Sequence, residues 1–208
     1  MKRTNIFLIL VELSLACTLF IDSFIKDVVA QNFLTVIMGS LFLVLVLFFK
    51  FESDNHALNS DSIYTIIIFA TIYYIAIYLL GLIIGFYKNK NSLEFINIFK
   101  NILQAGLFIL SAEMFRYMVV IKGKKSKVVL ILLVLVLSLC DTSDLIYKCN
   151  FMDISDTINL IGYHVLPSFI KNIMLTYLAL NVGYKPAIFY RVIFELPQYF
   201  VPIFPNVG

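Results

Sequence analysis

Charged side chains interrupt several stretches of this sequence that are otherwise strongly apolar. Glu113 and Arg116 stand three residues apart within SAEMFRYMVV, and Arg191 and Glu195 stand four residues apart within YRVIFE. Four more ionisable groups have similar apolar surroundings: Glu12, Asp22, Asp141 and Lys171. An ionised group in hydrocarbon costs at least about 2.5–3.5 kcal/mol, so such groups face a protein interior and pair. The chemistry open to them is ion pairing between helices, or the lining of a path for an ion, a proton or a small solute.

The motifs of hydrolytic and phosphate-binding enzymes are absent, since the sequence has no GxSxG, no HExxH and no phosphate-cradling glycine loop. An intramembrane protease of the CAAX-processing type would have a doubled glutamate before an arginine, whereas AEMFR has a single glutamate. Ser168 and Lys171 lie one helical turn apart, but an ion-pair partner is the better explanation of Lys171. The cysteines have no metal-ligand spacing. We therefore expect no catalytic residue, no metal site and no cofactor.

The composition is that of a membrane protein. Of the 208 residues, 61% are hydrophobic and 14% are charged, and the mean hydropathy is +0.94. Globular domains average about 45–50% apolar and about 25% charged residues. A net charge of +3, without a basic stripe interleaved with aromatics, argues against nucleic-acid binding. The expected partner is the lipid bilayer.

Long apolar runs predict transmembrane helices, because a bilayer core of about 30 Å needs roughly 20 apolar residues per helix. All prolines lie at position 167 or later, which predicts regular helices before that point and a bent element after it. We expect an all-α polytopic bundle of six spans plus a proline-broken seventh element, all within a single membrane domain of residues 1–208. The predicted spans are 6–25, 32–51, 63–87, 98–121, 128–147 and 165–183, with 187–205 as a candidate seventh.

The basic loop KGKKSK, residues 122–127, predicts a cytoplasmic N-terminus. With that orientation the buried charges fall into two layers, each with both signs. The inner layer contains Glu12, Glu113 and Arg116, and the outer layer contains Asp22, Asp141 and Lys171. We therefore predict ion pairs that place the first, fourth, fifth and sixth spans around a common interior.

Weaker polar and small-residue signals accompany these charges. Gln104, Asn172, Thr176 and Asn181 could hydrogen-bond across helices. The pair Gly81 and Gly85 in GLIIG has the small-xxx-small spacing that lets helix backbones approach closely. Arg191 and Glu195 are expected to lie side by side on a helix that ends before Pro197.

The end of the sequence resembles a known family. The pattern GYKP-x₃-YR-x₃-EL followed by a proline run ending PIFPN, residues 183–206, is similar to a segment in long signal-peptidase-like proteins of low-GC Gram-positive bacteria. That resemblance implies the N-terminal, multi-span half of such a protein, in a bacterial plasma membrane, ahead of an extracytoplasmic Ser/Lys domain. The catalytic serine–methionine segment of that family is absent here, so no catalytic residue is carried over.

Two functions remain open from the sequence. The first is a non-catalytic membrane domain that anchors or docks a protein partner or a downstream extracytoplasmic domain. The alternative is a permease for a small solute or ion, or the substrate-binding subunit of a transporter, with the buried charges along its path.

Overall fold

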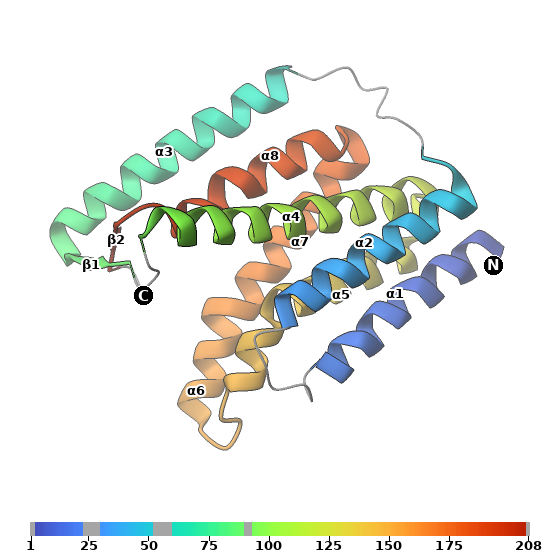
Figure 1. Cartoon of the computed structure of the whole chain (residues 1–208), viewed down its shortest axis with the longest axis horizontal. Helices are drawn as coiled ribbons and strands as arrows, with labels where there is room; N and C mark the ends of the chain where they lie inside the picture. Colours follow the sequence, from blue (N-terminus) through green and yellow to red (C-terminus); the bar gives the residue numbers. More distant parts are fainter. Residues whose placement is uncertain (1–2, 23–29, 52–59, 90–92, 207–208) are drawn as a thin grey trace.

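The computed structural model describes residues 3–22, 30–51, 60–89 and 93–206. Apart from two short strands, the regular secondary structure in these ranges is helical (Figure 1), which confirms the all-α class. Each of the six predicted spans overlaps an observed helix. The helical elements are α1 (Arg3–Asp22), α2 (Ala30–Phe49), α3 (Ser60–Ile84), α4 (Phe95–Gly123), α5 (Lys127–Lys148), α6 (Ile154–Asn159), the π-helical η1 (Leu160–Val165), α7 (Leu166–Asn181), α8 (Tyr184–Glu195) and the 3-10 turn η2 (Pro197–Tyr199).

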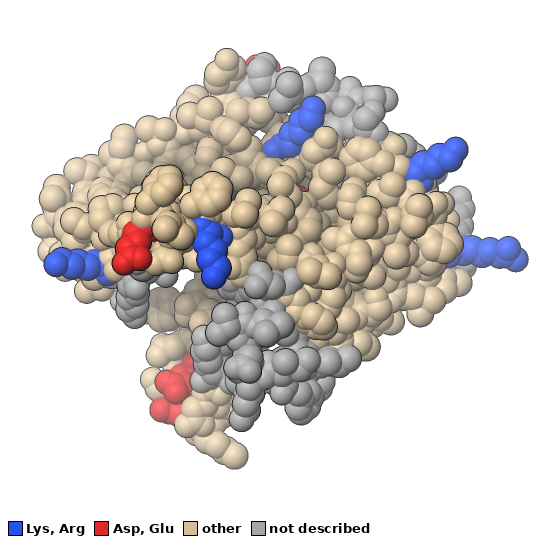
Figure 2. Space-filling model, viewed as in Figure 1, with Lys and Arg blue, Asp and Glu red and all other residues tan. Residues whose placement is uncertain are grey.

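Two helical segments in the described part of the chain are long and apolar enough to cross a membrane, Asp61–Ile84 and Phe95–Gly123, and Phe33–Phe49 is a shorter apolar helix. By this criterion six spans are not established. The surface nevertheless exposes large apolar side chains: along α3, Leu82 is 74% and Ile83 is 83% exposed. Figure 2 shows one face of the molecule, on which uncharged side chains predominate and few charged ones are visible.

The apolar core lies among α1, α2, α4 and α5. Its fully buried side chains include Leu15, Met38, Phe115 and Leu133, one from each of these helices. Together they form one cluster with their neighbours along the four helices. The first, second, fourth and fifth helices meet here through apolar groups. The buried ion pairs lie instead on the side where α7 and α8 pack.

The sixth predicted span is longer than expected. Helical backbone begins at Ile154 and continues through η1 into α7, whereas the sequence predicted a start at residue 165. The widened π turn directly precedes Pro167, whose ring would clash with the carbonyl of Tyr163 in a regular α-helix. Such bulges are one of the identified causes of local helix distortion.

The seventh element is broken as expected, but it is not one helix from 187 to 205. The 12-residue helix α8, about 18 Å long at 1.5 Å per residue, ends at Glu195, just before Pro197. The η2 turn and strand β2 (Ile203–Pro205) follow, and β2 pairs antiparallel with β1 (Phe86–Lys88). The composite α8–η2–β2 segment therefore runs from the turn after α7 to the far end of α3 (Figure 1).

The backbone of the α8–η2–β2 segment, called the tail below, is hydrogen-bonded to the end of α3 and to the residues that follow it. The Asn89 backbone N–H donates to the Pro202 carbonyl at 2.9 Å, and its side-chain amide donates to the carbonyls of Gln198 and Val201. The Tyr78 hydroxyl donates to the Ile203 carbonyl at 2.9 Å. These bonds give the irregular backbone of the tail partners within the protein.

The two glycines of GLIIG serve this docking rather than a helix-on-helix contact. A Cβ built on Gly81 would lie 2.6 Å from the Phe86 ring and 2.9 Å from Pro205 Cβ, so the tail packs directly on this backbone. Gly85 has φ = 100°, a left-handed conformation that ends α3 and turns the chain into β1. The sequence correctly predicts a close approach here, but the partner is the tail and not another long helix.

Candidate functional site

Arg116 is fully satisfied in the interior. Its Nε and Nη2 donate to the two carboxylate oxygens of Glu113, at 2.9 and 3.2 Å, from the same face of α4. Its remaining donors reach α7, where they bond the Thr176 hydroxyl at 2.9 Å, the Asn172 side-chain oxygen at 2.7 Å and the Asn172 carbonyl at 3.2 Å. All five guanidinium N–H groups thus have acceptors. Arg116 and Glu113 are both 0% exposed, so the Arg116 guanidinium lies inside the protein.

Arg191 joins two carboxylates, Glu113 and Asp141, that were predicted to lie in separate layers. Its Nη1 lies 3.2 Å from Glu113 Oε1 and its Nη2 lies 3.3 Å from Asp141 Oδ1. Its Nε and Nη2 also donate to Glu195 one helical turn further along α8, both at 2.8 Å. The guanidinium lies over the Phe108 ring, 5.5 Å from the centroid, a distance suited to a cation–π contact.

Lys171 completes the network at its more accessible side. Its Nζ is 2.8 Å from Asp141 Oδ2 and 3.0 Å from Glu195 Oε1. The Asn172 amide donates to the same Asp141 oxygen at 2.9 Å. Ser168, one turn before, donates weakly to Asp141 and to the Ser138 carbonyl. Lys171 is therefore bound by two carboxylates, as expected for an ion-pair partner.

The whole network is electrically balanced. It contains three carboxylates, Glu113, Asp141 and Glu195, and three cations, Arg116, Lys171 and Arg191. The six groups come from α4, α5, α7 and α8. A buried ion costs several kcal/mol unless neighbouring opposite charges and hydrogen bonds compensate it. This arrangement supplies both kinds of compensation.

Glu12 does not belong to the network, so the prediction that it pairs in the inner layer is wrong. Its side chain is 0% exposed, and neither carboxylate oxygen has a hydrogen-bond partner among the residues that the structure describes. The α1 helix packs on α5 and α4 through apolar side chains, with Leu8, Val11 and Leu15 in the core cluster. Arg116, its expected partner, is saturated by Glu113 and α7. The side chain of Asp22, the last residue of α1, lies outside the described residues.

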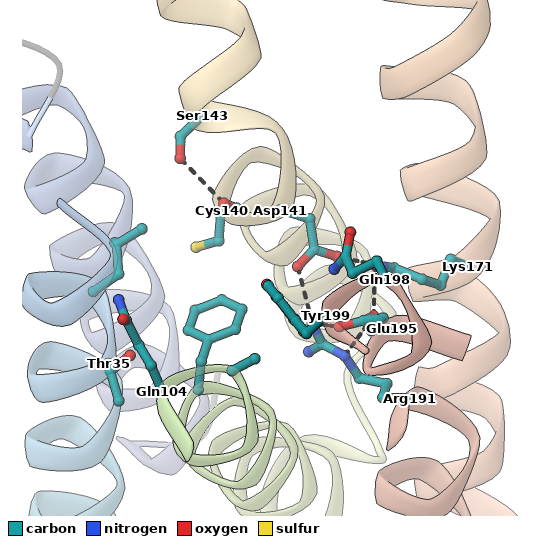
Figure 3. A pocket seen from close by; sticks show the side chains of 13 residues that line it. Thr35, Gln104, Cys140, Asp141, Ser143, Lys171, Arg191, Glu195, Gln198 and Tyr199 are labelled. Atoms are coloured by element: carbon teal, nitrogen blue, oxygen red, sulfur yellow. Dashed lines mark hydrogen bonds and ion pairs between the residues drawn. The ribbon is translucent and has the colours of Figure 1, made fainter. Parts of the chain in front are cut away.

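A cavity of about 270 Å³ lies against the Asp141–Lys171–Glu195 side of the network. Figure 3 shows Gln104 and Thr35 across the cavity from Lys171, Arg191 and Glu195. Residues of α2, α4, α5, α7, α8 and η2 line it. The lining residues are Leu34, Thr35, Gln104, Ala105, Phe108, Cys140, Asp141, Ser143, Lys171, Arg191, Glu195, Gln198 and Tyr199. The tail thus supplies four of the residues around a space that the first five helices alone would leave incomplete.

Sequence reasoning named the charged residues but missed the full polar stripe of α7. Ser168, Asn172 and Thr176 recur every four residues, so they share one helix face, and each bonds a residue of the network. This spacing was visible in the sequence and could have placed α7 beside Arg116. Gln198 and Tyr199 carried no comparable signal, because their position depends on the turn after Pro197.

Comparisons with protein families, curated proteins and solved structures find no significant match for this chain. Its function is therefore argued from its own residues.

Proposed function

We propose that this chain is a non-catalytic, multi-pass membrane domain that anchors or docks a partner. In this proposal α1 to α5 and α7 cross the bilayer as six spans, and the α8–η2–β2 segment crosses as a broken seventh. The observation that carries it is the combination of a neutral, largely buried charge network inside with apolar side chains such as Leu82 and Ile83 exposed outside. Contact of that outer surface with lipid would be favourable, whereas its contact with water would cost free energy.

The docking role is supported by how the charged groups are used. Arg116 and Arg191 spend their donors on carboxylates, amides and hydroxyls of this chain. Lys171 is held between two carboxylates rather than against Ser168. Groups committed in this way fix helix positions and leave no activated nucleophile in the network. The resemblance of residues 183–206 to the membrane half of signal-peptidase-like proteins supports the same role and a bacterial plasma membrane.

Membrane insertion is tested by expressing the chain in bacteria and extracting the membranes with alkaline carbonate. The integral domain should stay in the pellet, and release into the supernatant would overturn the proposal. Orientation is tested with single cysteines at Ser126 and Asn150 in a background lacking the native cysteines. A membrane-impermeant maleimide added to intact cells should label Asn150→Cys and not Ser126→Cys, and the reverse pattern would overturn a cytoplasmic N-terminus.

The link to signal-peptidase-like proteins is tested at the gene. A reading frame that continues beyond the codon for Gly208 into a Ser/Lys extracytoplasmic domain would support it. A stop codon followed by an unrelated neighbouring gene would remove this part of the proposal while leaving the membrane domain intact.

A second candidate function is a permease for a small solute or ion. The observation that favours it is the cavity beside Asp141, Lys171 and Glu195. Uptake of labelled solutes into liposomes containing the purified chain tests it, with Lys171→Met as the altered site and Lys185→Met, an exposed position on α8, as the control. If neither variant changes uptake, or if no uptake exceeds that of empty liposomes, the permease function fails.

A further inference from the structure

The cavity beside the charge network has the features of a binding site. Its volume of about 270 Å³ holds about nine water molecules at about 30 Å³ each, near the lower limit of small-molecule pockets, about 300 Å³. Charged and apolar groups both line it, among them Lys171 and Glu195 and also Leu34 and Phe108. A few polar groups set among apolar walls are typical of sites that bind and orient a small ligand.

The wall of the cavity keeps both a hydrogen-bond donor and hydrogen-bond acceptors that the network does not use. Lys171 Nζ has three N–H donors and uses two of them on Asp141 and Glu195. Glu195 Oε2 and Asp141 Oδ1 each accept one bond from Arg191, and each keeps a second lone pair. Lys171 and Glu195 are the most exposed members of the network, with side chains 26% and 24% exposed. The wall can therefore accept from a donor and donate to an acceptor.

The charge balance of the wall selects among ligands. Asp141, Lys171, Arg191 and Glu195 sum to zero, and all four are already paired. A ligand with a single net charge would leave an uncompensated ion beside these partly buried charges, which costs free energy. A ligand with one positive and one negative group adds no net charge and can use both the free donor and the free acceptors.

The geometry points to a binding site for a small zwitterionic solute that carries an ammonium and a carboxylate. The ammonium donates to the open lone pairs of Glu195 and Asp141. The carboxylate accepts the third N–H of Lys171, and the amide of Gln104 faces it across the cavity (Figure 3). This inference deepens the permease candidate by naming a solute class, and it requires binding but not transport.

Isothermal titration of the purified chain in lipid nanodiscs tests the site. The probes are the zwitterions β-alanine and 4-aminobutanoate, with methylammonium and acetate as singly charged comparators. At least one zwitterion should bind with a dissociation constant below about 1 mM, and both single ions should bind at least tenfold more weakly. No binding of either zwitterion, or equal binding of methylammonium or acetate, would overturn the proposal.

Ala105→Phe provides a variant that fills the cavity without removing a member of the network. The matched control is Leu103→Phe, which enlarges a 53% exposed side chain on the same helix. Ala105→Phe should weaken zwitterion binding at least tenfold while Leu103→Phe leaves it unchanged, with both variants melting near the parent temperature. Undiminished binding in a folded Ala105→Phe chain would place the ligand elsewhere and overturn the proposal. Lys171→Met offers a second test if Ala105→Phe fails to fold. Carbonate extraction reports on membrane insertion independently of all these results.

Discussion

Arg191 contacts Glu113 at 3.2 Å although the two residues lie 78 positions apart in the sequence. Both side chains are almost completely buried, at 2% and 0% exposure. Through this contact a short helix near the end of the chain reaches the centre of the fourth helix. It also connects the Glu113–Arg116 pair on one side with Asp141, Lys171 and Glu195 on the other.

Replacement of Arg191 by methionine should destabilise the chain severely. The variant leaves Glu113, Asp141 and Glu195 with only two cations, and removing one partner of a buried ion pair typically costs about 3–5 kcal/mol. Titration of the detergent-solubilised chain with SDS, followed by circular dichroism, measures the loss. Lys185→Met, an exposed substitution on the same helix, should change stability by less than about 0.5 kcal/mol. Equal stability of Arg191→Met and the parent would contradict the proposed role of the network.

Glu113 and Arg116 should be strongly coupled in a double-mutant cycle. Glu113→Gln alone leaves two guanidinium groups short of a carboxylate, whereas Glu113→Gln with Arg116→Gln restores the charge balance. The double variant should therefore be more stable than the sum of the singles predicts, by about 0.5–3 kcal/mol.

The control cycle combines Glu113→Gln with Lys127→Gln, an exposed residue at the start of α5. These effects should add within about 0.3–0.5 kcal/mol. Additivity in the first cycle as well would mean that Glu113 and Arg116 have no measurable interaction free energy.

Glu12→Leu should stabilise the chain. The Glu12 carboxyl is buried with no hydrogen-bond partner among the described residues, and an unsatisfied buried polar group costs about 1–3 kcal/mol. Leucine has a similar size and suits the surrounding Leu8, Val11 and Leu15. The midpoint of SDS unfolding should rise for Glu12→Leu and change less for Glu12→Gln, which keeps two polar atoms in the same place. A lower midpoint for Glu12→Leu would show that the carboxyl has a partner or a role.

The tail should be held at the end of α3 by strand pairing. In a chain without native cysteines, Tyr87→Cys and Phe204→Cys place thiols on residues that are direct partners in the β1–β2 register. Mild oxidation should crosslink them, which a cyanylation-and-cleavage assay on gels detects. Tyr64→Cys with Phe204→Cys is the matched control, because Tyr64 lies near the opposite end of α3, about 30 Å away at 1.5 Å per residue. Comparable crosslinking of both pairs would argue against a fixed register.

Hydropathy was enough to locate the five long helices and α7, because each coincides with a long apolar run, but it did not predict α6 or η1. It also marked the charged residues as interior. It could not decide which of them meet, since axial depth places Glu12 level with Glu113 but says nothing about the rotation of α1 about its axis. The i, i+4 spacing of Arg191 and Glu195 correctly placed them together.

The strand pair was beyond prediction for a related reason. Two three-residue segments, separated by more than a hundred positions, carry no periodic signal of their own. The prolines of the tail predicted a broken element but not its pairing, and Gly85 was interpreted only as a small residue that allows close packing. The π turn ahead of Pro167 likewise arises because proline has no backbone N–H to donate. The sequence shows the proline but not the form that the distortion takes.

The position of α3 has a consequence for synthesis. This helix packs mainly on α8 and β2, through contacts such as the stacked Tyr74 and Phe194 rings and the Tyr74 hydroxyl bond to the Ile193 carbonyl. Those partners are translated roughly a hundred residues after α3 itself. A ribosome that has just released the fifth helix has therefore made α3 without its final neighbours, and α3 reaches its mature arrangement only after residues 184–205 emerge.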